Sequence, residues 1–215
     1  MAPSTSDCMR ICALIVSATF CAMAASPAPP VETQLEQGYR HMYNLEFSQA
    51  HRSFAEWQGV HPDDPMAPAS DAAAYLFSEF DRLHILQSEF FTHDQHFITD
   101  HKLTPDPVLK RKFQAALDVA RKLAGRSPSN PNSMFALLLA SGLNSDYMAL
   151  IEKRYAASFQ EMKAARQDAE RLLAANPNYC DAWVAVGVEN YMLSIKAAPL
   201  RWLLRLAGGE ASLAM

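Results

Sequence analysis

The hydrophobic residues of this chain recur mainly at intervals of three and four positions, the period of a helix that packs along one face. Two intervening stretches, 61–68 and 93–104, are polar or rich in proline and are expected to connect helices. Asp106 followed by Pro107 marks a helix start, because aspartate is a good N-cap and proline fits the first helical position. The pattern predicts an all-α fold. The expected helices cover residues 31–44, 47–58, 70–91, 107–125, 132–142, 146–154, 159–175 and 181–193.

Small residues and prolines recur within this pattern at fixed distances. Counted from residue 31, Gly38 falls at position 8, Ala50 at 20, Phe54 at 24 and Pro62 at 32 of a repeating unit. Gly38 and Ala50 have little bulk, so two helices can approach closely where these residues cross. Phe54 is expected to fill the gap to the next unit, and Pro62 ends the second helix because proline cannot extend it.

A later unit keeps the same spacing, with Trp183 and Gly187 at positions 4 and 8. On these residues the sequence resembles the tetratricopeptide repeat family, which is built from helix–turn–helix units of 34 residues. The resemblance implies a right-handed α-solenoid of helical hairpins, an architecture that builds extended binding surfaces. The repeat domain is expected to span residues 31–215, with its clearest repeats at 31–64 and 159–193.

The spacing of the repeats is irregular, which makes this a divergent array. Pro62 and Pro128 are 66 residues apart and Pro128 and Pro177 are 49 apart, against about 34 in an undecorated repeat. In the last unit Pro199 falls at position 20, where a helix crossing needs a small helical residue. Either residues 200–207 cap the array, or the chain is the front part of a longer protein, which is the interpretation that we favour.

The N-terminal segment has the layout of a secretory signal peptide. Residues 11–24 are an apolar run that ends in the small residues Ala22-Met23-Ala24, and a proline-rich stretch, 25–30, follows. We therefore expect a signal peptide over residues 1–24, a linker over 25–30 and a periplasmic or secreted protein. Three of the four cysteines lie inside the signal segment, so the mature chain keeps only Cys180 and no internal disulfide.

Composition narrows the classes of function. The net charge is −4 and no dense basic patch is present, which argues against a nucleic-acid partner. The sequence contains neither a Gly-x-Ser-x-Gly elbow nor a phosphate-binding Gly-x-x-x-x-Gly-Lys loop. We therefore expect a non-catalytic scaffold that needs no cofactor and that binds a protein or peptide.

The resemblance also implies where a partner binds. Ligands of the family lie in a concave groove, at positions 2, 5, 9, 12 and 13 of the first helix in each hairpin. The groove residues so implied are Leu35, Tyr39, Met42, Tyr43, Val184, Val188, Tyr191 and Met192. Tyrosine and methionine are common in peptide-binding surfaces, although Tyr39 and Tyr43 have the alternative of packing against neighbouring helices. A clamp for a C-terminal carboxylate is absent, since Leu35 and Tyr39 stand where the family uses lysine and asparagine.

Two other functions remain as alternatives. His93, His96 and His101 lie close to aspartates in one polar segment, and imidazole with carboxylate suits zinc and similar metals. The alternative is therefore a metal-binding protein or a metal-dependent enzyme. The spacing of these histidines is not that of a His-Glu-x-x-His motif, and a solvated connector between helices is the interpretation of this segment that we favour. Residues 200–206, with Trp202 among leucines and arginines, are short and amphipathic and suggest a membrane-associated assembly component with peripheral membrane contact.

Overall fold

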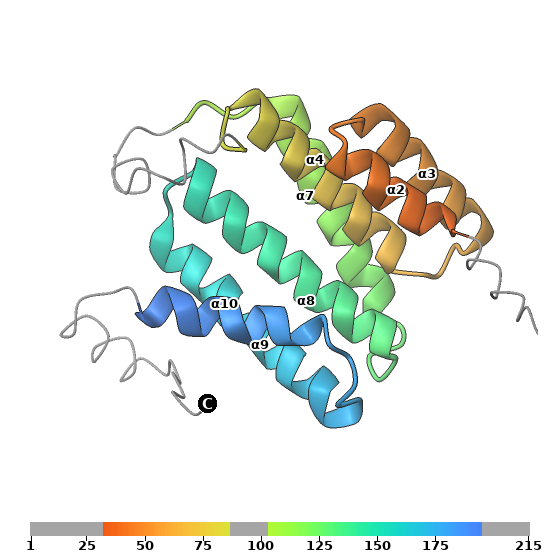
Figure 1. The fold of residues 1–215 in the computed structure, drawn as a ribbon, viewed down its shortest axis with the longest axis vertical. Helices are drawn as coiled ribbons and strands as arrows, with labels where there is room; N and C mark the ends of the chain where they lie inside the picture. Colours follow the sequence, from red (N-terminus) through yellow and green to blue (C-terminus); the bar gives the residue numbers. More distant parts are fainter. Residues whose placement is uncertain (1–31, 87–102, 195–215) are drawn as a thin grey trace, which may run out of the picture. The chain divides into compact units, whose positions relative to one another are not determined.

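The computed structural model describes residues 32–86 and 103–194, with side chains up to Tyr191 (Figure 1). Within these ranges the chain forms seven α-helices, one π-helical turn and no strand, which confirms the all-α prediction. All of these helices belong to one compact unit. The helices are α2 (Gln34–Tyr43), α3 (Phe47–Val60), α4 (Met66–Arg82), α7 (Pro107–Ala124), α8 (Pro131–Asp146), η1 (Tyr147–Ile151), α9 (Tyr155–Ala175) and α10 (Ala182–Ser194).

Several predicted features lie outside the described residues. They are the signal peptide and its linker, the histidine segment with His93, His96 and His101, and the amphipathic segment 200–206.

Side-chain caps fix the starts of the helices. At α2, the Thr33 hydroxyl accepts the Glu36 amide at 3.2 Å, and the Glu36 carboxylate accepts the Thr33 amide at 2.7 Å. These hydrogen bonds lower the pKa of Glu36. At α7, the Asp106 carboxylate accepts the amides of Val108 and Leu109 at 2.6 and 3.1 Å, as the Asp-Pro signal predicted.

Helix α4 begins at Met66, four residues before the predicted start, and so includes part of the stretch that we expected to be a connector. The Asp64 carboxylate accepts the Met66 amide at 3.0 Å and caps this start. Pro68 lies in the first turn, where an amide has no partner within the helix and its absence carries no penalty. The proline that indicated a connector is therefore compatible with a helix.

The same helix ends at Arg82 instead of near residue 91. His84 has a φ of 59°, and the Ile85 amide donates to the Phe80 carbonyl at 2.8 Å. This is the Schellman pattern of a helix C-terminus, with a buried Ile85 as its apolar contact. The residue in the left-handed conformation is a histidine instead of the more common glycine, so the sequence does not mark this helix end.

The helices are arranged so that every second one belongs to a common layer. Helices α2, α4, α8 and α10 contact one another in that order, and in Figure 1 each runs from right to left. Helix α3 contacts α2 and α4, helix α7 contacts α4 and α8, and helix α9 contacts α8 and α10. Each of these three helices therefore bridges two members of the layer.

The first hairpin packs through the small residues that the sequence pattern singled out. Gly38 and Ala50 are buried, and the ring of Phe54 lies directly on Gly38. Tyr39 meets the same ring edge-on, with 5.5 Å between the ring centroids. Phe54 thus fills the crossing within its own hairpin, and it belongs to the same core cluster as Ala72 and Leu76 of α4, the helix that follows the hairpin.

Two buried carboxylates join neighbouring helices, one through a hydrogen bond and one through an ion pair. The Glu79 carboxylate, almost fully buried, accepts Arg82 at 2.7 Å and the Asp106 amide at 2.7 Å, which connects the end of α4 to the start of α7. On the other side, Arg166 of α9 donates to the buried Glu189 of α10 at 3.1 Å. These contacts hold α7 against α4 and α10 against α9.

Candidate binding surface

Exposed and half-buried apolar side chains lie on α2, α8 and α10 of the helical layer. We call this set of exposed and half-buried residues the layer surface. It consists of Leu35, Tyr39, Tyr43, Phe135, Leu139, Gly142, Asp146, Val184, Val188 and Tyr191.

Helix α2 contributes a buried and an open tyrosine. Tyr39 is half-buried, its hydroxyl accepts a hydrogen bond from Ser70 at 2.7 Å, and burial raises its pKa to about 12. Tyr43 is 70% exposed. Tyr39 therefore packs against neighbouring helices, which was the alternative interpretation for this pair. The side chain of Tyr43 is open to solvent and accessible to a partner.

The other two predicted residues of α2 are less accessible. Leu35 is half-buried and packs against two clusters of the core. Met42 is only 2% exposed and belongs to the core beneath the helix. The structure therefore places Met42 away from any open groove, because position 12 of this short helix turns toward Phe54 and α4.

Helix α10 presents three of its predicted residues on one face. Val184, Val188 and Tyr191 are 65%, 47% and 65% exposed, and their spacing of four and three residues keeps them on one side of the helix. The side chain of Met192 lies outside the described residues. Helix α10 thus carries the largest exposed apolar area on this surface.

The C-terminal half of helix α8 is largely buried and opens along one narrow stripe. Between residues 138 and 147 only Leu139, Gly142 and Asp146 are not buried, and half-buried Phe135 extends this stripe by one turn. The intervals of four, three and four residues place all four on one face. A methyl group added to Gly142 would meet no atom within 4 Å, so the space beside the stripe is open.

Asp146 is the charged residue of that stripe. It is the only charged residue from Pro131 to Ile151. Although its side chain is accessible to water, the surrounding protein raises its pKa to about 6 through burial. Among the residues that the structure describes, none donates a hydrogen bond or a salt bridge to its carboxylate.

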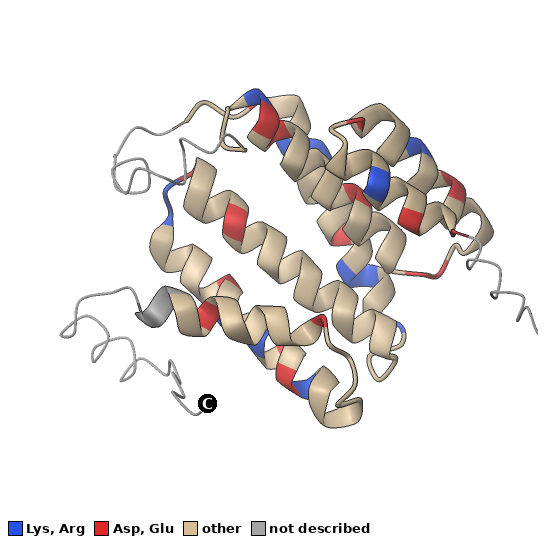
Figure 2. Cartoon of the chain, viewed as in Figure 1, with Lys and Arg blue, Asp and Glu red and all other residues tan. Residues whose placement is uncertain are grey.

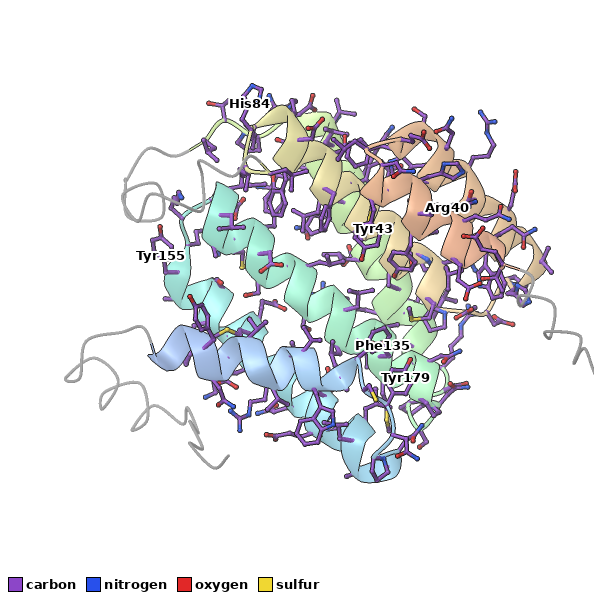
Figure 3. All side chains as sticks on the ribbon, viewed as in Figure 1. Arg40, Tyr43, His84, Phe135, Tyr155 and Tyr179 are labelled. Atoms are coloured by element: carbon purple, nitrogen blue, oxygen red, sulfur yellow. The ribbon has the colours of Figure 1, made fainter. Side chains whose placement is uncertain are left out.

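Aromatic contacts link the start of α10 to α8 and α2. Phe135 and Tyr179 pack with ring centroids 5.1 Å apart, and Figure 3 shows them side by side. Tyr179 and Asp181 both lie near enough to Tyr39 to raise its pKa further. The start of α10 therefore lies close to Phe135 of α8 and to Tyr39 of α2.

Sequence reasoning missed the contribution of α8. Counting from Pro128 at position 32 places Phe135 and Leu139 at positions 5 and 9, the same positions that identified Val184 and Val188. The signal was therefore present, but the irregular spacing of the middle units hid it. Asp146 follows eleven residues after Phe135, beyond the groove positions of the family, and no motif marks it.

Charge is distributed unequally between the layer and the bridging helices (Figure 2). In α2, α4, α8 and α10 the only lysine or arginine residues are Arg40 and Arg82, and Arg82 is bound by Glu79. The bridging helices α3, α7 and α9 contain nine such residues, eight of them on α7 and α9. These cations are Arg52, Lys110, Arg111, Lys112, Arg121, Lys122, Lys163, Arg166 and Arg171.

Two observations concern other kinds of site. In the described part of the chain no group of three or more His, Cys, Asp or Glu side chains is placed to hold a metal ion. Residues Pro131–Ile151 form one helix long and apolar enough to cross a membrane, but half of that stretch is buried by the other helices. Burial of this kind is typical of a core helix.

Comparison with known proteins gave no match: no family model, no curated protein and no solved structure is significantly similar to this chain.

Proposed function

We propose that this chain is an exported, non-catalytic scaffold that binds a protein or peptide along the layer surface. One observation carries the proposal. Helices α2 and α10 expose apolar side chains on one layer, including Tyr43, Val184, Val188 and Tyr191, and α8 between them adds the half-buried Phe135 and Leu139. Exposed aromatic and aliphatic anchors that converge on one surface are typical of recognition sites for proteins.

The proposal includes a tetratricopeptide-like, right-handed solenoid. The order of helix contacts supports it, since each hairpin of such an array packs its first helix on the first helix of the next. The contact between Gly38 and Phe54 supports it too, because a repeat of this kind needs a small residue at the helix crossing. Export to the periplasm or the medium rests on the signal-like sequence of residues 1–24.

The layer surface can be tested with a pair of matched valines. Val188 on α10 and Val119 on α7 are each 47% exposed, but only Val188 belongs to the layer surface. Immobilised full-length chain would be used to recover partners from the exported fraction of the source cells. We expect Tyr43→Ala combined with Val188→Ala to reduce recovery about tenfold, as loss of two interface anchors does.

Val119→Ala serves as the control and is expected to recover the partner like the wild type. Circular dichroism of each variant checks that its helical content is unchanged. Equal recovery by the wild type and by the Tyr43→Ala, Val188→Ala double variant would refute the assignment of the partner site to this surface.

A further inference from the structure

We infer that the layer surface recognises a peptide segment with a lysine or arginine flanked by apolar residues, and that its cation pairs with the Asp146 carboxylate over Gly142. This inference rests on the proposed function and specifies the chemistry of the partner.

Space for such a side chain exists beside Asp146. Gly142 precedes Asp146 by one helical turn on the same open stripe, and no atom lies within 4 Å of the position that a Cβ would take there. Leu139 and Phe135 continue the stripe and offer apolar contact. A long cationic side chain fits this arrangement, because its methylene groups pack on apolar surface while its charged end reaches a carboxylate.

The charge of the stripe selects a cation. Asp146 has no donor among the described residues, and neither α8 nor α10 contains a lysine or arginine that would neutralise it. A neutral peptide laid over this stripe would remove water from an unpaired carboxylate, which is unfavourable. An acidic peptide would add repulsion, so charge complementarity favours a basic segment.

The apolar neighbours distinguish this site from a simple electrostatic patch. Val184, Val188 and Tyr191 on α10 and Tyr43 on α2 are exposed and uncharged. A polycation would leave these side chains without matching contacts, whereas a single cation between apolar residues satisfies both features. A metal ion is a poorer occupant, since oxygen-binding metals need several protein ligands and the stripe offers one carboxylate.

Selection from a display library of short random peptides against the immobilised 215-residue chain tests the inference. We expect the enriched peptides to share one lysine or arginine between apolar residues. The best peptide is then synthesised with lysine and with norleucine at that position, and both are titrated by fluorescence anisotropy. Norleucine keeps the aliphatic length without the charge, so the wild type should bind it about tenfold more weakly.

Asp146→Asn is the decisive variant, and Asp118→Asn on the exposed side of α7 is its control. Asp146→Asn should bind the lysine and norleucine peptides equally, while Asp118→Asn should keep the tenfold preference. Enrichment of peptides without a basic residue, or an unchanged preference in Asp146→Asn, would overturn the inference and leave the proposed binding surface intact. Failure to enrich any peptide would count against the proposed function itself.

Discussion

Substitution of Gly38 by alanine tests how the first hairpin is packed. A Cβ built on Gly38 would lie 2.6 Å from Cδ1 and 2.8 Å from Cζ of the Phe54 ring, and closer still to Cε1. Ordinary carbon contacts are about 3.5–4.0 Å, so the ring has to move by about 1 Å. Phe54 is 1% exposed and packs against Tyr39, which leaves it little room to move.

Two opposing effects set the size of the change. Overpacking of a tight core costs about 1–3 kcal/mol. Alanine gains about 1 kcal/mol over glycine in a helix interior, which offsets part of that cost. We therefore expect Gly38→Ala to lower the free energy of unfolding by up to about 2 kcal/mol.

Gly142→Ala provides the matched comparison, because an added Cβ there meets no atom within 4 Å. Only the gain in helix propensity applies, so this variant should be stabilised by about 0.5–1 kcal/mol. Urea unfolding followed by circular dichroism at constant slope measures both changes. The reasoning about the hairpin is refuted if Gly38→Ala and Gly142→Ala shift the midpoint in the same direction by similar amounts.

Three further predictions concern other parts of the chain. Leu45 follows the C-terminus of α2 and has a left-handed φ of 62°. Glycine adopts this conformation without strain, so Leu45→Gly should raise the free energy of unfolding by about 1 kcal/mol. A thermal melt measures this change, and a lower melting temperature would contradict the prediction. Burial raises the pKa of Asp146 to about 6, which penalises its charged form in the folded state. Asp146→Asn should therefore stabilise the chain above pH 6, with the gain disappearing as the pH falls toward about 4, the ordinary carboxyl pKa; a gain that does not vary with pH would exclude this cause. Arg166→Met leaves Glu189 buried without its partner and should cost about 3 kcal/mol, with faster hydrogen exchange in α10 that Glu189→Gln partly reverses.

The sequence predicted the helices better than their ends. Periodic apolar positions are a strong local signal, and every described helix overlaps a predicted one. The predicted ends of α4 were wrong because the proline-rich stretch 61–68 was taken as a connector and the apolar pattern after Arg82 as a continuation of the helix. Pro68 fits in the first turn, and His84 ends the helix in a left-handed conformation that the apolar pattern does not reveal.

The binding surface was predicted less completely than the fold, for a different reason. Whether a side chain is open depends on which neighbouring helix covers it, and the spacing of a repeat does not contain that information. Met42 and Tyr43 are adjacent in the sequence, yet one lies in the core and the other is exposed. Asp146 gained its significance only when the structure showed that residues 138–147 are buried everywhere except along one stripe.

Stability alone does not explain the residues on that stripe. Glycine in a helix interior is unfavourable by about 1 kcal/mol relative to alanine, and Gly142 has no close contact that would require it. Gly38 carries the same penalty, but the ring of Phe54 needs the space. Asp146 adds a carboxylate whose pKa is raised by burial, one turn after Gly142, in a helix that is otherwise uncharged. Two residues that stability does not favour therefore lie side by side on the one open face of α8 between residues 138 and 147, which is what we expect if the proposed recognition of a partner shaped this stripe.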